Sequence, residues 1–426
     1  MKKTIYFIAL LIAAFTIIIS GNSLQAQGSV VSDTVVMGAS YANEIYYSMQ
    51  NGKILASPRN TWDIAFRTML RSSSILTNDG SGVVLYTYPK SDTSGWAGMD
   101  TTGFKTWTPM YNDVNDWENG AFSRNAKGYP DYGWGIYNSV SHDLNGDSLF
   151  IIQLRDGSLR KLWIKDKHSV QDTYHFRFAN LDGTNDHTDT LNLSNDLATD
   201  FIGFSLETNQ RVNFQPPVSN WDLLFTKYMS IQPGDVPYPA MAVLCNPDIR
   251  SKKFHPVPLT YTNWQVGPWD SLRSSIGWDW KVFSTATMTY KVVDSLEYFI
   301  EPASKDVYKL HFTSFAGGTT GVISFIKEKV LAFSINEHTS SGLSVKVYPN
   351  PVSDKLNLLV TANNSGELHI VLSDLSGRQL GADHPVGLRE GLNQFSIDVT
   401  GFKPGVYFLT ASTADTKAVT KVIITR

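Results

Sequence analysis

Short runs in which apolar and polar residues alternate recur along the chain and predict β-strands. Examples are residues 83–88, 149–154 and 174–178. Between such runs lie Asn-Gly and Asp-Gly pairs, which supply the positive φ that tight hairpins need. Beyond residue 26 no long stretch shows the 3.6-residue period of an amphipathic helix. The pattern therefore predicts an all-β protein.

The first 26 residues follow a different pattern. Lys2 and Lys3 precede an apolar run over 5–19, and small and polar residues follow it up to Ala26. This order is typical of a signal peptide, and the run is shorter than the ~20 apolar residues that span a bilayer. We expect 1–26 to be removed during export and 27–43 to form an N-terminal segment. No later segment is apolar enough to span a membrane, so a water-soluble mature chain is expected.

A sequence repeat divides the middle of the chain. Trp62, Asp63 and Phe66 belong to the run Trp-Asp-Ile-Ala-Phe, which returns as Trp-Asp-Leu-Leu-Phe with Trp221, Asp222 and Phe225. The flanks repeat in the same order, with 47–50 matching 204–207 and 161–164 matching 309–312. Several matches in one order indicate duplication. We therefore predict two related β-rich units in tandem, over 44–183 and 200–330.

The repeated Trp-Asp step has a structural interpretation. Neighbouring residues on a strand face opposite sides, so the indole is expected in the core and the carboxylate at a turn or a backbone donor. Trp and Phe at matched positions usually mark a shared core. We therefore assign these residues to packing rather than to ligand contact.

The C-terminal part has its own pattern. A polar stretch over 331–343 is expected to be a linker, and 344–426 contains evenly spaced short strands that predict an Ig-like β-sandwich of about seven strands. The segment resembles the type A sorting domain of the type IX secretion system of Bacteroidetes. The positions that carry this resemblance are Tyr348, Pro349, Asn350, Pro351, Gly377, Gly405, Tyr407 and Lys421. It implies passage through the periplasm, recognition by the secretion machinery at the outer membrane, and usually removal of the domain as the cargo is attached to the cell surface.

Composition narrows the classes of partner. The formal charge is −3, and no stretch carries a dense run of Lys and Arg, so nucleic acid is not an expected partner. Cys245 is the single cysteine, which excludes an intramolecular disulfide and a metal site built from cysteines alone. Aromatic residues make up 12% of the chain, as suits packed sheets.

The repeated units also resemble a known family. The run 62–66, followed by a Lys-apolar strand and the aromatic strand 174–178, is similar to the HmuY-like family, and the second unit repeats these features. The resemblance implies an all-β fold and extracellular haem binding. This chain would contain two such units in tandem, whereas the form typical of the family has a single unit.

A haem site needs an apolar slot and axial ligands such as His or Met. Histidines and methionines are scattered through both units, and we select His168 and His175 as candidate haem ligands because they lie at opposite ends of one short hairpin-like stretch. We find no compact catalytic signature and expect no enzyme. A structural or adhesive surface module and an extracellular polymer hydrolase stay open as alternatives to haem or porphyrin binding.

Overall fold

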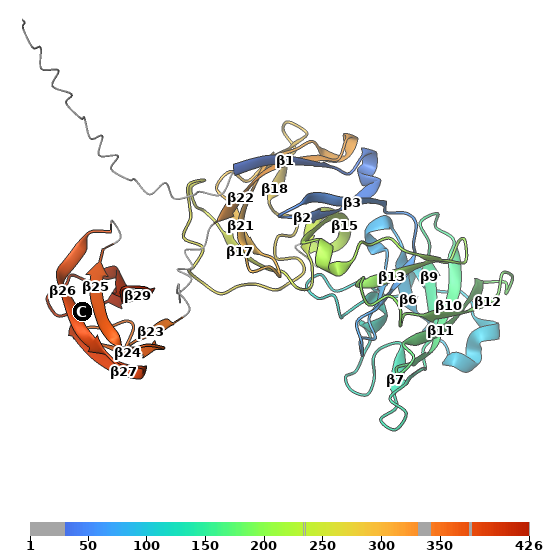
Figure 1. Cartoon of the computed structure of the whole chain (residues 1–426). Coiled ribbons are helices and arrows are strands. Elements are labelled where there is room, and N and C mark those ends of the chain that lie inside the picture. The colour runs from blue at the N-terminus through green and yellow to red at the C-terminus, as the bar shows by residue number, and fades with distance from the viewer. Residues whose placement is uncertain (1–29, 233, 235, 331–341, 375–376, 426) are drawn as a thin grey trace, which may run out of the picture. The chain divides into compact units, whose positions relative to one another are not determined.

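The computed structural model describes residues 30–232, 234, 236–330, 342–374 and 377–425 (Figure 1). The predicted signal peptide 1–26, residues 27–29 of the next segment and 331–341 of the predicted linker lie outside the described residues. The chain divides at residue 330 into two compact units. Strands dominate both, and the helices assigned within the described ranges are short 3₁₀ turns. The predicted all-β class is confirmed.

The first unit contains two lobes, and the first lobe encloses its core between two sheets. The larger sheet has the order β12-β11-β10-β8-β7, with β9 paired to β10 and β6 to β9. The smaller sheet has the order β14-β13-β4-β5. The bounds are Ile64–Arg67 (β4), Ile75–Thr77 (β5), Val84–Thr87 (β6), Gly135–Tyr137 (β7), Leu144–Gly146 (β8), Phe150–Gln153 (β9), Leu159–His168 (β10), Thr173–Asn180 (β11), His187–Asn192 (β12), Phe201–Ser205 (β13) and Gln210–Val212 (β14).

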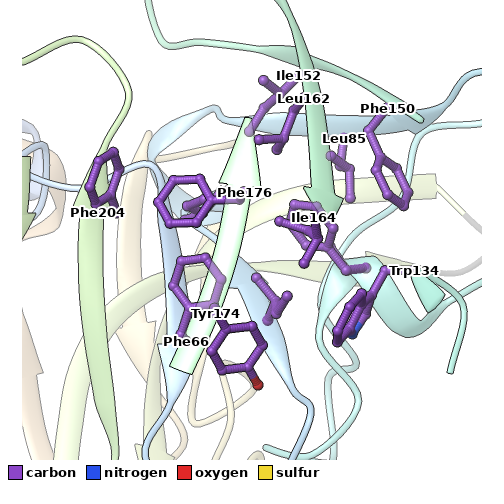
Figure 2. Close-up of a cluster of buried hydrophobic side chains, with 14 of the residues drawn as sticks. Phe66, Leu85, Trp134, Phe150, Ile152, Leu162, Ile164, Tyr174, Phe176 and Phe204 are labelled. Carbon is purple, nitrogen blue, oxygen red and sulfur yellow. The ribbon is translucent and has the colours of Figure 1, made fainter. Parts of the chain in front are cut away.

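Aromatic side chains fill this core. Figure 2 shows Phe66 of β4 beside Tyr174 and Phe176 of β11, and the ring centroids lie 4.8 and 5.3 Å from that of Phe66. Phe204 of β13 meets Phe176 edge-on at 4.9 Å. Contacts of this geometry add to the free energy gained from burial alone.

The second lobe has the same plan. One sheet has the order β1-β22-β21-β20-β17, and the other has the order β16-β15-β2-β3. A separate hairpin joins β18 to β19. The bounds are Val30–Val36 (β1), Asn43–Ser48 (β2), Gly52–Pro58 (β3), Leu223–Gln232 (β15), Val236–Cys245 (β16), Arg250–Phe254 (β17), Lys281–Ser284 (β18), Thr289–Val292 (β19), Glu297–Glu301 (β20), Val307–Phe315 (β21) and Val322–Val330 (β22).

The two lobes exchange hairpins. The hairpin β2–β3 comes early in the chain but pairs with β15 of the second lobe (Figure 1). The hairpin β13–β14 pairs with β4 of the first lobe. In the sequence each hairpin precedes the Trp-Asp run of its own repeat. In the structure each hairpin joins the Trp-Asp strand of the other repeat. The predicted boundaries 44–183 and 200–330 therefore do not coincide with the lobes at their N-terminal ends.

The exchange places the central strands of the two small sheets, β4 with β13 and β2 with β15, between two apolar cores. In β4 and β13 every residue is buried. Ile64 faces the first-lobe core, whereas Ala65 packs into a third core between the lobes, which also contains Trp62 and Trp221. A sheet covered on both faces has no polar face and therefore no alternation.

The second unit is a seven-stranded sandwich. Its sheets have the orders β23-β24-β27 and β26-β25-β28-β29 and share one apolar core. The bounds are Leu343–Tyr348 (β23), Lys355–Ala362 (β24), Gly366–Ser373 (β25), Gln379–Leu388 (β26), Gly391–Asp398 (β27), Gly405–Ser412 (β28) and Lys417–Ile424 (β29). Its seven strands agree with the sandwich of about seven strands expected from the sequence. No helix among the residues that the structure describes is long and apolar enough to cross a membrane.

Candidate functional site

An apolar hollow of about 530 Å³ opens on the second lobe, and we call it the aromatic pocket. It lies along β16 and the β18–β19 hairpin, with a contribution from the 3₁₀ turn at 39–41. Its walls include Tyr41, Tyr238, Met241, Phe283 and Tyr290. Pockets of 300–1,000 Å³ with mainly apolar walls and a few placed polar groups are typical of small-molecule sites.

The aromatic walls are held by rings behind them. The ring of Tyr290 lies 4.8 Å from that of Phe315 and 5.0 Å from that of Phe283, both edge-on. Tyr41 stacks on the other side of Phe315 at 6.1 Å. Because Phe315 is buried in the lobe core, these wall residues are positioned before any ligand arrives.

Lys281 supplies a buried cation to the pocket. It is 7% exposed, and its Nζ donates to the carbonyl oxygens of Met241 at 2.7 Å and Trp278 at 3.1 Å. The Nζ also lies 4.3 Å from the centre of the Trp280 ring. Burial lowers the pKa of Lys281 to about 7, although the nearby Asp279 opposes this shift. In its protonated form the side chain has three N–H donors, and the two carbonyl oxygens accept two of them.

The described lining of the pocket contains few charged groups besides Lys281. Lys227 lines it, and burial lowers the pKa of this lysine as well. Asp279 accepts a hydrogen bond from Lys253 at 2.6 Å and is the single carboxylate among the described lining residues. Burial raises the pKa of Tyr41 to about 12, with Tyr290 and Tyr238 adding to the shift, so its hydroxyl stays a donor at neutral pH.

The rim of the pocket exposes apolar surface. Tyr238 is 54% exposed, Val282 62% and Phe283 42%. Single exposed apolar residues are ordinary, but a group of them around a hollow marks a binding surface. The sequence contained only a weak signal for this site, because these residues are spread over four segments and look like ordinary strand residues.

The structure places the selected histidines elsewhere. His168 ends β10 and His175 lies in β11, both in the first lobe, and their ring centroids are 5.3 Å apart. The structure thus brings the pair together. Both rings approach the carboxylate of Asp166, which sequence reasoning did not single out. Neither histidine lines the aromatic pocket.

The aspartates of the two Trp-Asp pairs accept hydrogen bonds from the backbone of the exchanged hairpins. Trp62 and Trp221 are buried and lie two positions before the first residues of β4 and β15 rather than within these strands. The Asp63 carboxylate accepts a hydrogen bond from the Leu206 N–H at 2.7 Å, and the Asp222 carboxylate accepts one from the Met49 N–H at 2.6 Å. Phe66 and Phe225 lie in the cores of the two lobes.

In the C-terminal sandwich, the Pro-Asn-Pro run is tied to the last strand. Asn350 donates through Nδ2 to the carbonyl oxygen of Lys421 at 2.7 Å and accepts through Oδ1 from the Ile423 N–H at 2.8 Å. The Tyr407 hydroxyl donates to the Lys403 carbonyl oxygen at 2.6 Å. Tyr348 accepts from Gln394, while Pro349 and Pro351 flank Asn350.

Residues 346–425 match the family model described as "Secretion system C-terminal sorting domain". This segment is a type IX secretion sorting domain. The sorting domain directs the protein to the extracellular space or the cell surface and implies interaction with the secretion machinery. Gly377 and Gly405 of the predicted motif lie within the matched range.

Comparison of the whole chain is less informative. No curated protein matches it. Among solved structures, the crystal structure of dimeric latent PorU from Porphyromonas gingivalis shares 9% identity with a TM-score of 0.17. The similarity covers 89% of this chain and 40% of the PorU chain, so the chain spans less than half the length of that protein.

Proposed function

We propose that this exported protein binds a planar, largely apolar small molecule with an anionic group in the aromatic pocket, and that haem or another porphyrin is the ligand. The observation that carries the proposal is the buried Lys281 beside preorganised aromatic walls. Flat aromatic walls favour a flat ligand through stacking. A cation that has lost its water shell favours a carboxylate through a charge-assisted hydrogen bond.

The donor set of the pocket is compatible with haem. Haem iron is held in proteins by His, Cys, Met or Tyr, and the pocket is lined by Met241 and by the phenols of Tyr41, Tyr238 and Tyr290. The resemblance of the repeated units to the HmuY-like family supports the same ligand class. Lys281 and Lys227 would hold the propionate groups, and the aromatic walls would cover the macrocycle.

Titration of the full mature chain, residues 27–426, with haemin tests the proposal. A saturable shift of the Soret band is expected, and metal-free protoporphyrin IX measures the part of the affinity that needs no iron. Replacing Lys281 by Met removes a charge-assisted hydrogen bond of ~1.5–3 kcal/mol, so affinity should fall at least about tenfold. Lys305→Met is the control, because Lys305 is 69% exposed and pairs with Glu301.

The pH dependence gives a second test with a defined sign. An anion beside Lys281 raises the pKa of this lysine above its ligand-free value of about 7. Ligand binding then takes up a proton, and affinity should fall as the pH rises above about 7. Affinity that is unchanged between pH 6.5 and 8.5 would contradict the role of Lys281.

The other outcomes separate the alternatives. A band weakened by the double variant His168→Gln/His175→Gln, and not by Lys281→Met, would move the haem site to the first lobe. A featureless titration would favour a structural or adhesive surface module. Polymer hydrolysis has less support, because glycoside hydrolysis needs two carboxyl groups and the described lining residues of the pocket include one.

A further inference from the structure

The hairpin formed by β10 and β11 carries three metal-binding residue types on one face. Asp166 and His168 are two residues apart on β10, so their side chains point to the same side of the sheet. His175 of β11 is the cross-strand partner of Asp166, and paired residues share a face. The hairpin register therefore gathers one carboxylate and two imidazoles.

The distances between these groups are short. The Nδ1 atom of His175 lies 2.5 Å from Oδ1 of Asp166, and Nε2 of His168 lies 3.5 Å from the same oxygen. One ligand atom from each residue falls within 4.8 Å of the others. The side chains are 26%, 46% and 31% exposed for Asp166, His168 and His175, so an ion can reach them from solvent.

A second carboxylate stands beside the cluster. Asp143 directly precedes β8, and β8 pairs with β10 next to His168. Its Oδ2 atom lies 3.4 Å from Nδ1 of His168, while its Oδ1 accepts a hydrogen bond from the Ser169 N–H at 3.0 Å. The backbone hydrogen bond holds this carboxylate in place.

We propose that Asp166, His168 and His175 bind a divalent transition-metal ion such as Zn²⁺ through Nε2 of His168, with Asp143 as the acceptor at Nδ1 that orients this ring. Imidazole nitrogens and carboxylate oxygens are ordinary zinc ligands. Bonds of about 2.0–2.1 Å in a tetrahedron place neighbouring ligand atoms about 3.4 Å apart. The separation of 3.5 Å between His168 and Asp166 agrees with that edge.

The contact between His175 and Asp166 must change on binding. At 2.5 Å it is a hydrogen bond, so the two atoms separate by about 0.9 Å for both to ligate one tetrahedral ion. Both side chains are partly exposed, which permits such a rotation. The Asp166 carboxylate contacts both imidazole rings. A haem held between the two histidines would have to occupy the position of this carboxylate. The cluster is therefore built for a bare ion rather than for haem.

Isothermal titration of the full mature chain with Zn²⁺ at pH 7.5 tests this inference. We expect one site that disappears, or weakens at least tenfold, in the double variant His168→Gln/His175→Gln. His255→Gln is the control, since His255 is an exposed histidine of the other lobe. Circular dichroism of each variant checks that the fold is retained.

Co²⁺ provides an independent readout. A tetrahedral Co²⁺ ion absorbs strongly in the visible range, and this band should appear with the native chain and be lost in Asp166→Asn. Absence of a Zn²⁺ site in the native chain, or an equal site in the double histidine variant, would overturn the proposal. Because the aromatic pocket lies in the other lobe, this result is separate from the haemin titration.

Discussion

Removing the Asp63 carboxylate should destabilise the first unit more than removing its repeat counterpart Asp222. Asp63 is fully buried and accepts a hydrogen bond from the Leu206 N–H, so Asp63→Ala leaves a buried donor unpaired, at a cost of ~1–3 kcal/mol. It also breaks an ion pair with Arg155 at 2.7 Å. Breaking a buried ion pair by removing one partner costs ~3–5 kcal/mol, because the other charge is left unpaired. Arg155 keeps its second ion pair, with Glu207 at 3.1 Å, so the cost is smaller here. We therefore expect Asp63→Ala to lower the free energy of unfolding by ~3 kcal/mol in total.

Asp222→Ala removes the equivalent backbone hydrogen bond, to the Met49 N–H, and Asp222 forms no ion pair among the residues that the structure describes. Its expected cost is therefore ~1–2 kcal/mol. Urea unfolding followed by tryptophan fluorescence measures both, because all 11 Trp residues precede residue 330 and the sorting domain is silent. An equal or larger loss in Asp222→Ala would refute the reasoning. Asp63→Asn, which keeps an acceptor oxygen, should fall between the native chain and Asp63→Ala.

Three further changes test other parts of the structure. Burial raises the pKa of Glu297 to about 7, so between about pH 4.5 and 7 the folded state holds a proton that the unfolded state has lost, and stability falls as the pH rises through this range. Urea unfolding of Glu297→Gln should show a flatter pH profile and a gain of ~1–3 kcal/mol at pH 8. A Cβ at Gly146 would lie 1.7 Å from a β10 carbonyl oxygen, so Gly146→Ala should strongly lower the urea midpoint of unfolding. Gly98→Ala is the control, because a Cβ there meets open space and should change the free energy of unfolding by no more than ~0.5 kcal/mol. Asn350→Ala removes two hydrogen bonds to the last strand and should speed hydrogen exchange of β29, with a loss of ~1–2 kcal/mol, while the tryptophan-detected transition stays unchanged.

Much of the sorting domain could be predicted from the sequence because its signals are local. Strands such as 355–362 alternate between core and solvent, and turn residues separate them at short intervals. Three of its pairings, β23–β24, β25–β26 and β28–β29, join strands that are consecutive in the chain. The export route follows from the same segment, since the sorting domain is recognised by its own motif.

The candidate sites could not be predicted in the same way. His168 and His175 were selected as a pair, and they do lie together because a single hairpin joins them. Their carboxylate partners Asp166 and Asp143 were not singled out, since Asp143 reaches His168 only through the pairing of β8 with β10. The aromatic pocket depends on still longer connections, because Tyr41 and Tyr290 meet only through the packing of Phe315.

By itself, the sequence determined the β class, the Trp-Asp repeat and the sorting domain, because periodicity, turn residues and motifs are properties of neighbouring residues. The tertiary structure alone decided that the hairpins are exchanged. The hairpins pair with strands far from them in the chain, β2 with β15 and β13 with β4, so no local signal fixes the partner. With the exchange, the central strands of both small sheets are covered on two faces and share the core between the lobes, and this burial joins residues far apart in the chain.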